Sequence, residues 1–245
     1  TSTSPQVGDI VVESSAQIDI DAGKKVSVCG RFTGGFGTPS QIIGNGEIEL
    51  NGSSQQLLFE HLVFNNLRLN NAAGAAMQPG SVYDVMNEVR LQSGTLDANS
   101  GVLHFNSLAD NQIAIIDNFS AGYSGTVIGP ITADRYYHSS STYDAHYMGS
   151  PVDNAPLSQF GAGGTSGFAI PKANCDETQL HYTSPYGTVA SYDQSNGASC
   201  ALGGWFFETS GNAVNAKGYS IRFTGAGVVS VNGEANLNAS YSLGG

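Results

Sequence analysis

The sequence predicts an all-β protein: an N-terminal right-handed parallel β-solenoid (β-helix) in residues 1–130, followed by a β-sandwich-like domain in residues 131–245. Three observations predict this class. Glycine, which weakens helices, accounts for 32 of the 245 residues and is nearly twice as frequent as usual. Charged residues make up only 12% of the chain, which leaves few ion pairs to stabilise helix surfaces. Short stretches of alternating apolar and polar residues, separated by Asn and Gly, are typical of strands and turns.

A loose repeat in the first half of the chain predicts the solenoid. The alternating stretches that form it are 17–28, 46–52, 62–74 and 89–101. The positions taken as equivalent, with separations of 30, 19 and 22 residues, are Ile18, Ile48, Leu67 and Val89. One rung cannot bury its inward side chains alone, whereas stacked rungs share one apolar interior. An antiparallel meander or sandwich has similar alternation and remains an alternative, because the spacing is irregular.

The character of the sequence changes after residue 106. An apolar strand is expected at 113–116, and the domain boundary is placed near Pro130. The strands expected beyond it are 178–182, 204–208, 217–223 and 228–233. The last two are separated by a Gly-rich turn and are expected to form a hairpin. These short strands predict the β-sandwich-like domain.

The order of several short motifs resembles that of large surface proteins that Bacteroidota export through the type IX secretion system. The motifs are FNNLRLNNAAG at 64–74, LQSGTLDANSG at 91–101, GPITADRY at 129–136, YMGSPV at 147–152, KGYSIRFTG at 217–225 and VNGEAN at 231–236. The resemblance implies a tandem of a β-helix and a sandwich-like domain in an extracellular, adhesin-like protein. It brings no catalytic motif, and this chain would be an internal module of a longer polypeptide.

The charge balance excludes several classes of partner. The net charge is −11, so the chain has no basic stripe for nucleic acid and little attraction to anionic lipid.

No apolar run approaches the roughly 18 residues of a membrane-spanning helix, so membrane insertion is not expected. The first residues lack a Met and an apolar signal region, which indicates a mature or excised piece of a larger protein.

Four acidic residues form the candidate metal site. Asp19 and Asp21, like Glu47 and Glu49, are two residues apart, so each pair shares one face of a strand. If the rungs aligned, the two pairs would stack into an acidic ladder that could hold Ca²⁺ through carboxylate oxygens. Close carboxylates could also raise one another's pKa, as a general acid requires. The simplest interpretation is a solvated outer face, and no other cofactor is expected.

The three cysteines have different expected roles. Cys175 and Cys200 lie in polar, turn-rich sequence and are the candidate disulfide, although two unpaired thiols are the alternative. Cys29 lies in an alternating strand and is expected to be a small buried residue.

Aromatic residues concentrate in the second half of the chain and form the candidate ligand-binding set. Exposed Tyr and Trp side chains stack on sugar rings or anchor protein interfaces, but about half of them would be core residues in a sandwich. The candidates are Tyr136, Tyr137, Tyr143, Tyr147 and Trp205.

The sequence therefore predicts a non-enzymatic, extracellular structural or adhesive module without catalytic residues, which acts through its shape. Expected partners are other surface proteins, glycans or copies of itself, with filament assembly or attachment as uses. The resemblance implies gliding as a further use. A carbohydrate-binding module and a β-helical polysaccharide-cleaving enzyme are the alternatives.

Overall fold

The computed structural model describes residues 5–110, 112–118, 120–138, 144–161, 189–192, 205–207, 211–214, 217–223, 226–235 and 237. Strands dominate these residues, and their only helix is the short 3₁₀ helix η1 (Leu157–Gly161), which confirms the all-β class. The described residues divide into two compact units. The first holds residues 5–107 and most of 112–132, and the second holds 108–110 and most of 133–235.

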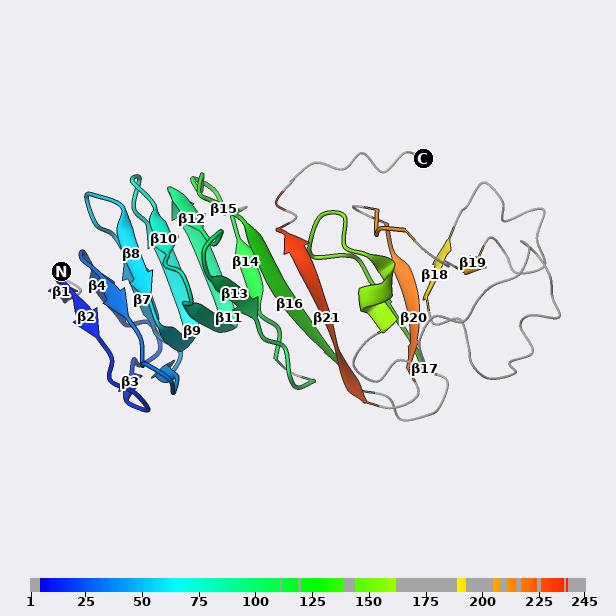
Figure 1. The fold of residues 1–245 in the computed structure, drawn as a ribbon, viewed down its shortest axis with the longest axis horizontal. Helices are drawn as coiled ribbons and strands as arrows, with labels where there is room; N and C mark the ends of the chain where they lie inside the picture. Colours follow the sequence, from blue (N-terminus) through cyan, green and yellow to red (C-terminus); the bar gives the residue numbers. More distant parts are fainter. Residues whose placement is uncertain are drawn as a thin grey trace. The chain divides into compact units, whose positions relative to one another are not determined.

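The first unit is a parallel β-solenoid of about five turns, as predicted (Figure 1). Each turn has three sides, which we call face 1, face 2 and face 3. Face 1 contains β3 (Gln17–Asp19), β6 (Ser40–Ile43), β13 (Val102–Phe105) and the first halves of β9 (His61–Asn70) and β11 (Val82–Ser93). Face 2 contains β1 (Gln6–Val7), β4 (Lys25–Val28), β7 (Glu47–Leu50), the second halves of β9 and β11, and β14 (Ile115–Asp117). Face 3 contains β2 (Ile10–Val11), β5 (Phe32–Thr33), β8 (Gln56–Phe59), β10 (Ala75–Met77), β12 (Thr95–Asp97) and β15 (Thr126–Ile128).

The register corrects the predicted repeat at its first position. Ile48 pairs with Leu67 and Leu67 pairs with Val89, as predicted. The residue that pairs with Ile48 on the preceding turn is Val26, not Ile18. Ile18 lies in face 1 and pairs with Ile42. With Val26 as the first member, the separations become 22, 19 and 22 residues, so the irregular spacing came from comparing two different faces.

Inward side chains of successive turns stack into one apolar interior. Two rows of inward side chains are completely buried: Ile48, Leu67 and Val89 form one row, and Leu50, Leu69 and Leu91 form the next.

Tyr83 fills the centre between faces 1 and 3. Its ring meets Phe64 and Phe32 edge to face, with centroid distances of 5.7 and 6.5 Å, and its hydroxyl donates to the Phe32 carbonyl at 3.2 Å. Burial raises the pKa of Tyr83 well above its usual value, so this phenol stays protonated.

Glycine and asparagine form tight corners between faces 2 and 3. Gly94 has φ of +87°, and a Cβ atom there would lie 1.8 Å from the Asn71 carbonyl oxygen, so this corner requires glycine. Asn71 is almost fully buried. Its amide donates to the carbonyls of Ser54 and Gly74 at 2.8 and 3.0 Å, and its side-chain oxygen accepts the backbone N–H of Ala73 at 2.9 Å. The predicted Asn/Gly corners thus have a direct steric and hydrogen-bonding basis.

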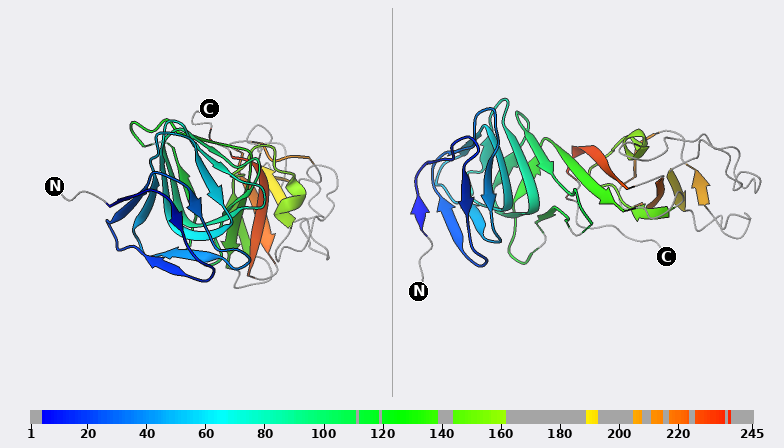
Figure 2. Two further views of the ribbon diagram at one scale, coloured as in Figure 1. Left: turned by 60° about the vertical axis from the view of Figure 1, so that its left-hand side comes forward. Right: turned by 90° about the horizontal axis from the view of Figure 1, so that it is seen from below.

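The second unit contains a four-stranded antiparallel sheet in the order β17-β20-β18-β19 (Figures 1 and 2). Its strands are β17 (Asp144–Met148), β18 (Val189–Tyr192), β19 (Trp205–Phe207) and β20 (Tyr219–Phe223). Phe160 of η1 packs on Tyr219 of β20 with a centroid distance of 5.8 Å, and both residues are buried.

The predicted hairpin between the last two strands is wrong. β20 pairs with β17 and β18, whereas β21 (Gly227–Glu234) lies beside β16 (Pro130–Tyr137) in another sheet. The chain therefore passes from one sheet to another between β20 and β21. A short Gly-rich linker is compatible with either connection, and the partner strands were too distant in sequence to identify. The strand expected at 178–182 lies outside the described residues.

Candidate functional site: a charged groove on face 2

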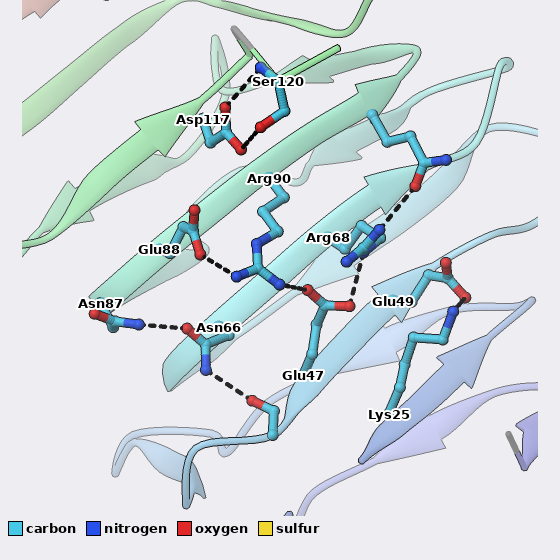
Figure 3. Close-up of polar contacts among 12 residues, drawn as sticks. Lys25, Glu47, Glu49, Asn66, Arg68, Asn87, Glu88, Arg90, Asp117 and Ser120 are labelled. Carbon is cyan, nitrogen blue, oxygen red and sulfur yellow. Dashed lines mark hydrogen bonds and ion pairs between the residues drawn. The ribbon is translucent and has the colours of Figure 1, made fainter. Parts of the chain in front are cut away.

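Polar side chains form cross-turn networks on the outer surface of face 2 (Figure 3). Strand alternation causes this arrangement: residues between the inward Ile48/Leu50, Leu67/Leu69 and Val89/Leu91 pairs point outward. Because the strands are parallel, each outward side chain lies beside the outward side chains of the neighbouring turns, about 4.8 Å along the stack, and contacts them directly across or diagonally.

Glu47 is the centre of the network. It is 7% exposed and accepts hydrogen bonds from Arg68 Nε at 2.7 Å and Arg90 Nη1 at 2.9 Å. Arg68 and Arg90 are paired in register on β9 and β11, so Arg90 reaches past one complete turn to Glu47. Arg68 also donates to Gln92 at 3.0 Å, and Arg90 contacts Glu88 at 2.6 Å. Burial alone lowers the pKa of both guanidinium groups, but the neighbouring carboxylates outweigh it and raise each pKa above its usual value.

Glu49 forms a second network beside the first. It is nearly buried and contacts Lys25 Nζ at 2.8 Å, while Ser27 donates to it at 2.7 Å and Asn70 at 3.3 Å. Burial by itself raises the pKa of Glu49, but these donors and the Lys25 charge outweigh it, so the pKa is lower than usual. A carboxyl group with a lowered pKa is ionised at neutral pH and does not supply the proton that a general acid donates.

A polar groove of about 520 Å³ opens beside these networks. Its lining residues are Gly23, Lys24, Lys25, Asn45, Gly46, Glu47, Asn66, Arg68, Asn87 and Arg90. Asn87 donates to Asn66 at 2.6 Å, and Asn66 donates to the Gly46 carbonyl at 2.8 Å, so hydrogen bonds connect three of the lining residues. The groove thus offers cations and amides, the groups that bind anions and hydroxyls.

A second polar cluster lies on face 1. Asp84 accepts N–H bonds from His61 Nε2 at 2.7 Å and His104 Nδ1 at 3.0 Å, and Asn106 donates to it at 3.0 Å. Burial raises the pKa of Asp84, but the two histidines outweigh burial, so its pKa is lower than usual. The cluster again joins residues of successive turns, from β9, β11 and just after β13.

The predicted acidic ladder does not form. Asp19 pairs in register with Ile43 on face 1, and Asp19 and Asp21 are both exposed, whereas Glu47 and Glu49 lie on face 2 in register with Lys25 and Ser27. The error follows from the misplaced first repeat. In the described part of the chain, no group of three or more His, Cys, Asp or Glu side chains could hold a metal ion, and this includes the cluster of His61, Asp84 and His104.

The aromatic candidates are spread over different environments. Tyr137 is buried and its ring lies 5.1 Å from that of His146, so it belongs to the interior of the second unit, while Tyr136 is half-buried. Tyr147 is 72% exposed on β17. Trp205 begins β19, which pairs with β18. Tyr143, like the candidate disulfide residues Cys175 and Cys200, lies outside the described residues.

Cys29 differs from its prediction. It is exposed, and its thiol donates to Asn51 Oδ1 at 3.3 Å. It follows the last residue of β4, where the chain turns toward face 3, so the strand alternation that predicted burial has already ended.

Sequence reasoning missed the two central arginines. Arg68 and Arg90 each follow one of the equivalent positions, Leu67 and Val89, so the predicted repeat already placed them side by side on the outer face. The positions of the two arginines could therefore have been found from the repeat, but only the acidic residues were considered as a candidate site.

Comparisons with known proteins assign no family: no family model matches the chain, and no curated protein or solved structure matches it significantly. Among the helices of the described residues, none has the length and apolar character needed to cross a membrane.

Proposed function

We propose that this chain is a non-enzymatic structural module of a large extracellular bacterial surface protein. The solenoid, wound right-handed, serves as a stiff spacer, and the second unit, a β-sandwich-like domain, presents loops for attachment. The order of the sequence motifs supports the surface location.

The observation that carries this proposal is the direction of the polar contacts on the solenoid. The ion pairs of Glu47 and Glu49 and the contacts of Asp84 with His61 and His104 all join one turn to another. Such contacts oppose separation of the turns along the stack, which is what a spacer under tension requires. The same pairing lowers the pKa of Glu49 and Asp84, the opposite of the change that a general acid needs.

Force–extension measurement on single molecules tests the spacer role. The complete chain is held by handles at its two ends and stretched. We expect a force peak that releases the solenoid, with a gain in contour length of roughly 40 nm for its approximately 125 residues. E47Q should lower the peak force, while E13Q, which changes an exposed glutamate outside the networks, should not. Extension over this length without a force peak would refute the spacer role.

Incubation with polysaccharides tests the enzymatic alternative. A panel of acidic and neutral polysaccharides is treated with the protein, and chain lengths are followed by size-exclusion chromatography. The proposal predicts unchanged chain lengths. Shortened products that depend on protein concentration would establish a cleaving enzyme instead.

A further inference from the structure

The basic residues of this acidic protein are concentrated in one place. The chain has nine Lys and Arg residues and a net charge of −11, yet four of the nine line the groove on face 2. Glu47 is the one carboxylate among the lining residues and pairs with Arg68 and Arg90, while Glu49 and Glu88, outside the lining, pair with Lys25 and Arg90. Four cations against these three carboxylates leave the groove with a net charge of about +1, on a molecule whose overall charge is negative.

The groove retains donors that the networks do not use. Lys24 is exposed and forms no salt bridge with the residues that the structure describes. An arginine has five N–H donors, and the contacts with Glu47, Gln92 and Glu88 engage two of them on Arg68 and two on Arg90. The other N–H groups of Arg68 and Arg90 are the donors that an anion bound beside Glu47 would use.

The remaining lining residues indicate which class of ligand would bear the anionic group. Asn45, Asn66 and Asn87 provide amide donors and acceptors, and the lining contains neither aromatic nor aliphatic side chains. A peptide ligand would need apolar pockets for its anchoring side chains, whereas a sugar with many hydroxyl groups matches an amide-rich surface. The volume of about 520 Å³ is within the range of small-molecule sites and accommodates one or two sugar rings.

We propose that the groove on face 2 binds a carboxylated saccharide, such as a uronic acid unit of an acidic glycan. Lys24, with the outer donors of Arg68 and Arg90, binds the carboxylate, and Asn45 and Asn87 bind ring hydroxyls. This site goes beyond the spacer role and does not depend on it, because stretching and sugar binding measure independent properties.

Isothermal titration calorimetry with the complete chain tests the proposal. Trigalacturonic acid is the ligand, and galactotriose, which has the same ring framework without carboxylates, is the matched neutral control. We expect the acid to bind in low salt, the affinity to fall as NaCl is raised, and the neutral trisaccharide to give no heat of binding. Equal binding of the two trisaccharides, or no binding of either, would overturn the proposal.

Two variants with the same charge change locate the site. K24Q removes a groove cation that lies outside the structural networks, and about a fivefold weaker affinity is expected for one exposed charge contact. R31Q removes an exposed cation outside the groove and should leave the affinity unchanged. Thermal melting verifies that both variants are folded. Equal affinities of K24Q and R31Q would refute the assignment, and so would a triglutamate peptide that binds more tightly than the sugar.

Discussion

Removal of the Glu47 charge is the most direct test of the network on face 2. In E47Q the side chain keeps its shape and one acceptor oxygen, but two guanidinium groups lose their shared carboxylate. Hydrogen bonds to charged groups contribute about 1.5–3 kcal/mol each, and the partial exposure of Arg68 and Arg90 reduces these values by screening. Since the amide oxygen of the variant would still accept one of the two bonds, we expect a loss of about 2 kcal/mol in the free energy of unfolding.

Urea unfolding followed by far-UV circular dichroism measures this loss. For an m-value of about 2 kcal/mol/M, the midpoint should fall by roughly 1 M without a change in m. The control is E13Q, the same substitution at an exposed glutamate outside the networks, which should stay within about 0.5 kcal/mol of the parent. Equal midpoints for E47Q and E13Q would show that the network does not stabilise the solenoid.

Three further predictions concern corners and charge. G94A should be strongly destabilising, because its Cβ would lie 1.8 Å from the Asn71 carbonyl oxygen, and thermal melting should show a much larger loss than for G80A. N71A should cost about 2–3 kcal/mol in urea unfolding, because it leaves buried corner groups without their hydrogen bonds. The pKa of Asp84 is lower in the folded state, so its contribution to stability is present above its unfolded pKa of about 4 and is lost as pH falls through the lower folded value. D84N should therefore be less stable than the parent at pH 7, with a smaller difference at pH 3.

A control substitution for G94A separates the backbone strain of a left-handed residue from the steric clash of its Cβ atom. Gly80 has φ of +82°, and no atom lies within 4 Å of the position that a Cβ would take there, so G80A measures the backbone cost of a left-handed residue alone. Equal melting temperatures for G94A and G80A would contradict the predicted clash. A stability difference between D84N and the parent that is the same at pH 3 and pH 7 would contradict the role assigned to the Asp84 charge.

The fold class and the solenoid were predictable because local signals encode them. The alternation of apolar and polar residues predicts which side of each strand faces the interior. Corners that require Gly or Asn, such as the one at Gly94, can be recognised directly in the sequence. The equivalence of Ile48, Leu67 and Val89 was found because their turns have similar lengths. The register of the first turn was missed, since Ile18 on face 1 and Val26 on face 2 lie in strands with the same alternation.

The candidate site was only partly predictable for the same reason. Glu47 and Glu49 stood out as a pair within one strand, but their partners belong to other turns, with Arg68 and Arg90 lying 21 and 43 residues from Glu47. Such pairings depend on the three-dimensional register, which the local sequence does not specify. β21 and β20 likewise belong to different sheets. Their pairing partners are distant in sequence, and the local sequence does not distinguish one possible partner strand from another.

Two contacts in the solenoid pass over an intervening turn: Arg90 reaches Glu47, and the Tyr83 hydroxyl reaches the Phe32 carbonyl. In most repeat proteins each repeat touches only its immediate neighbours, which lets the stack melt from its ends in small steps. Here the Arg90–Glu47 contact on the outer surface and the Tyr83–Phe32 hydrogen bond in the interior connect turns that are not adjacent. The middle of the solenoid should consequently denature as a single cooperative block, and hydrogen exchange of its amide protons should give one common free energy of opening.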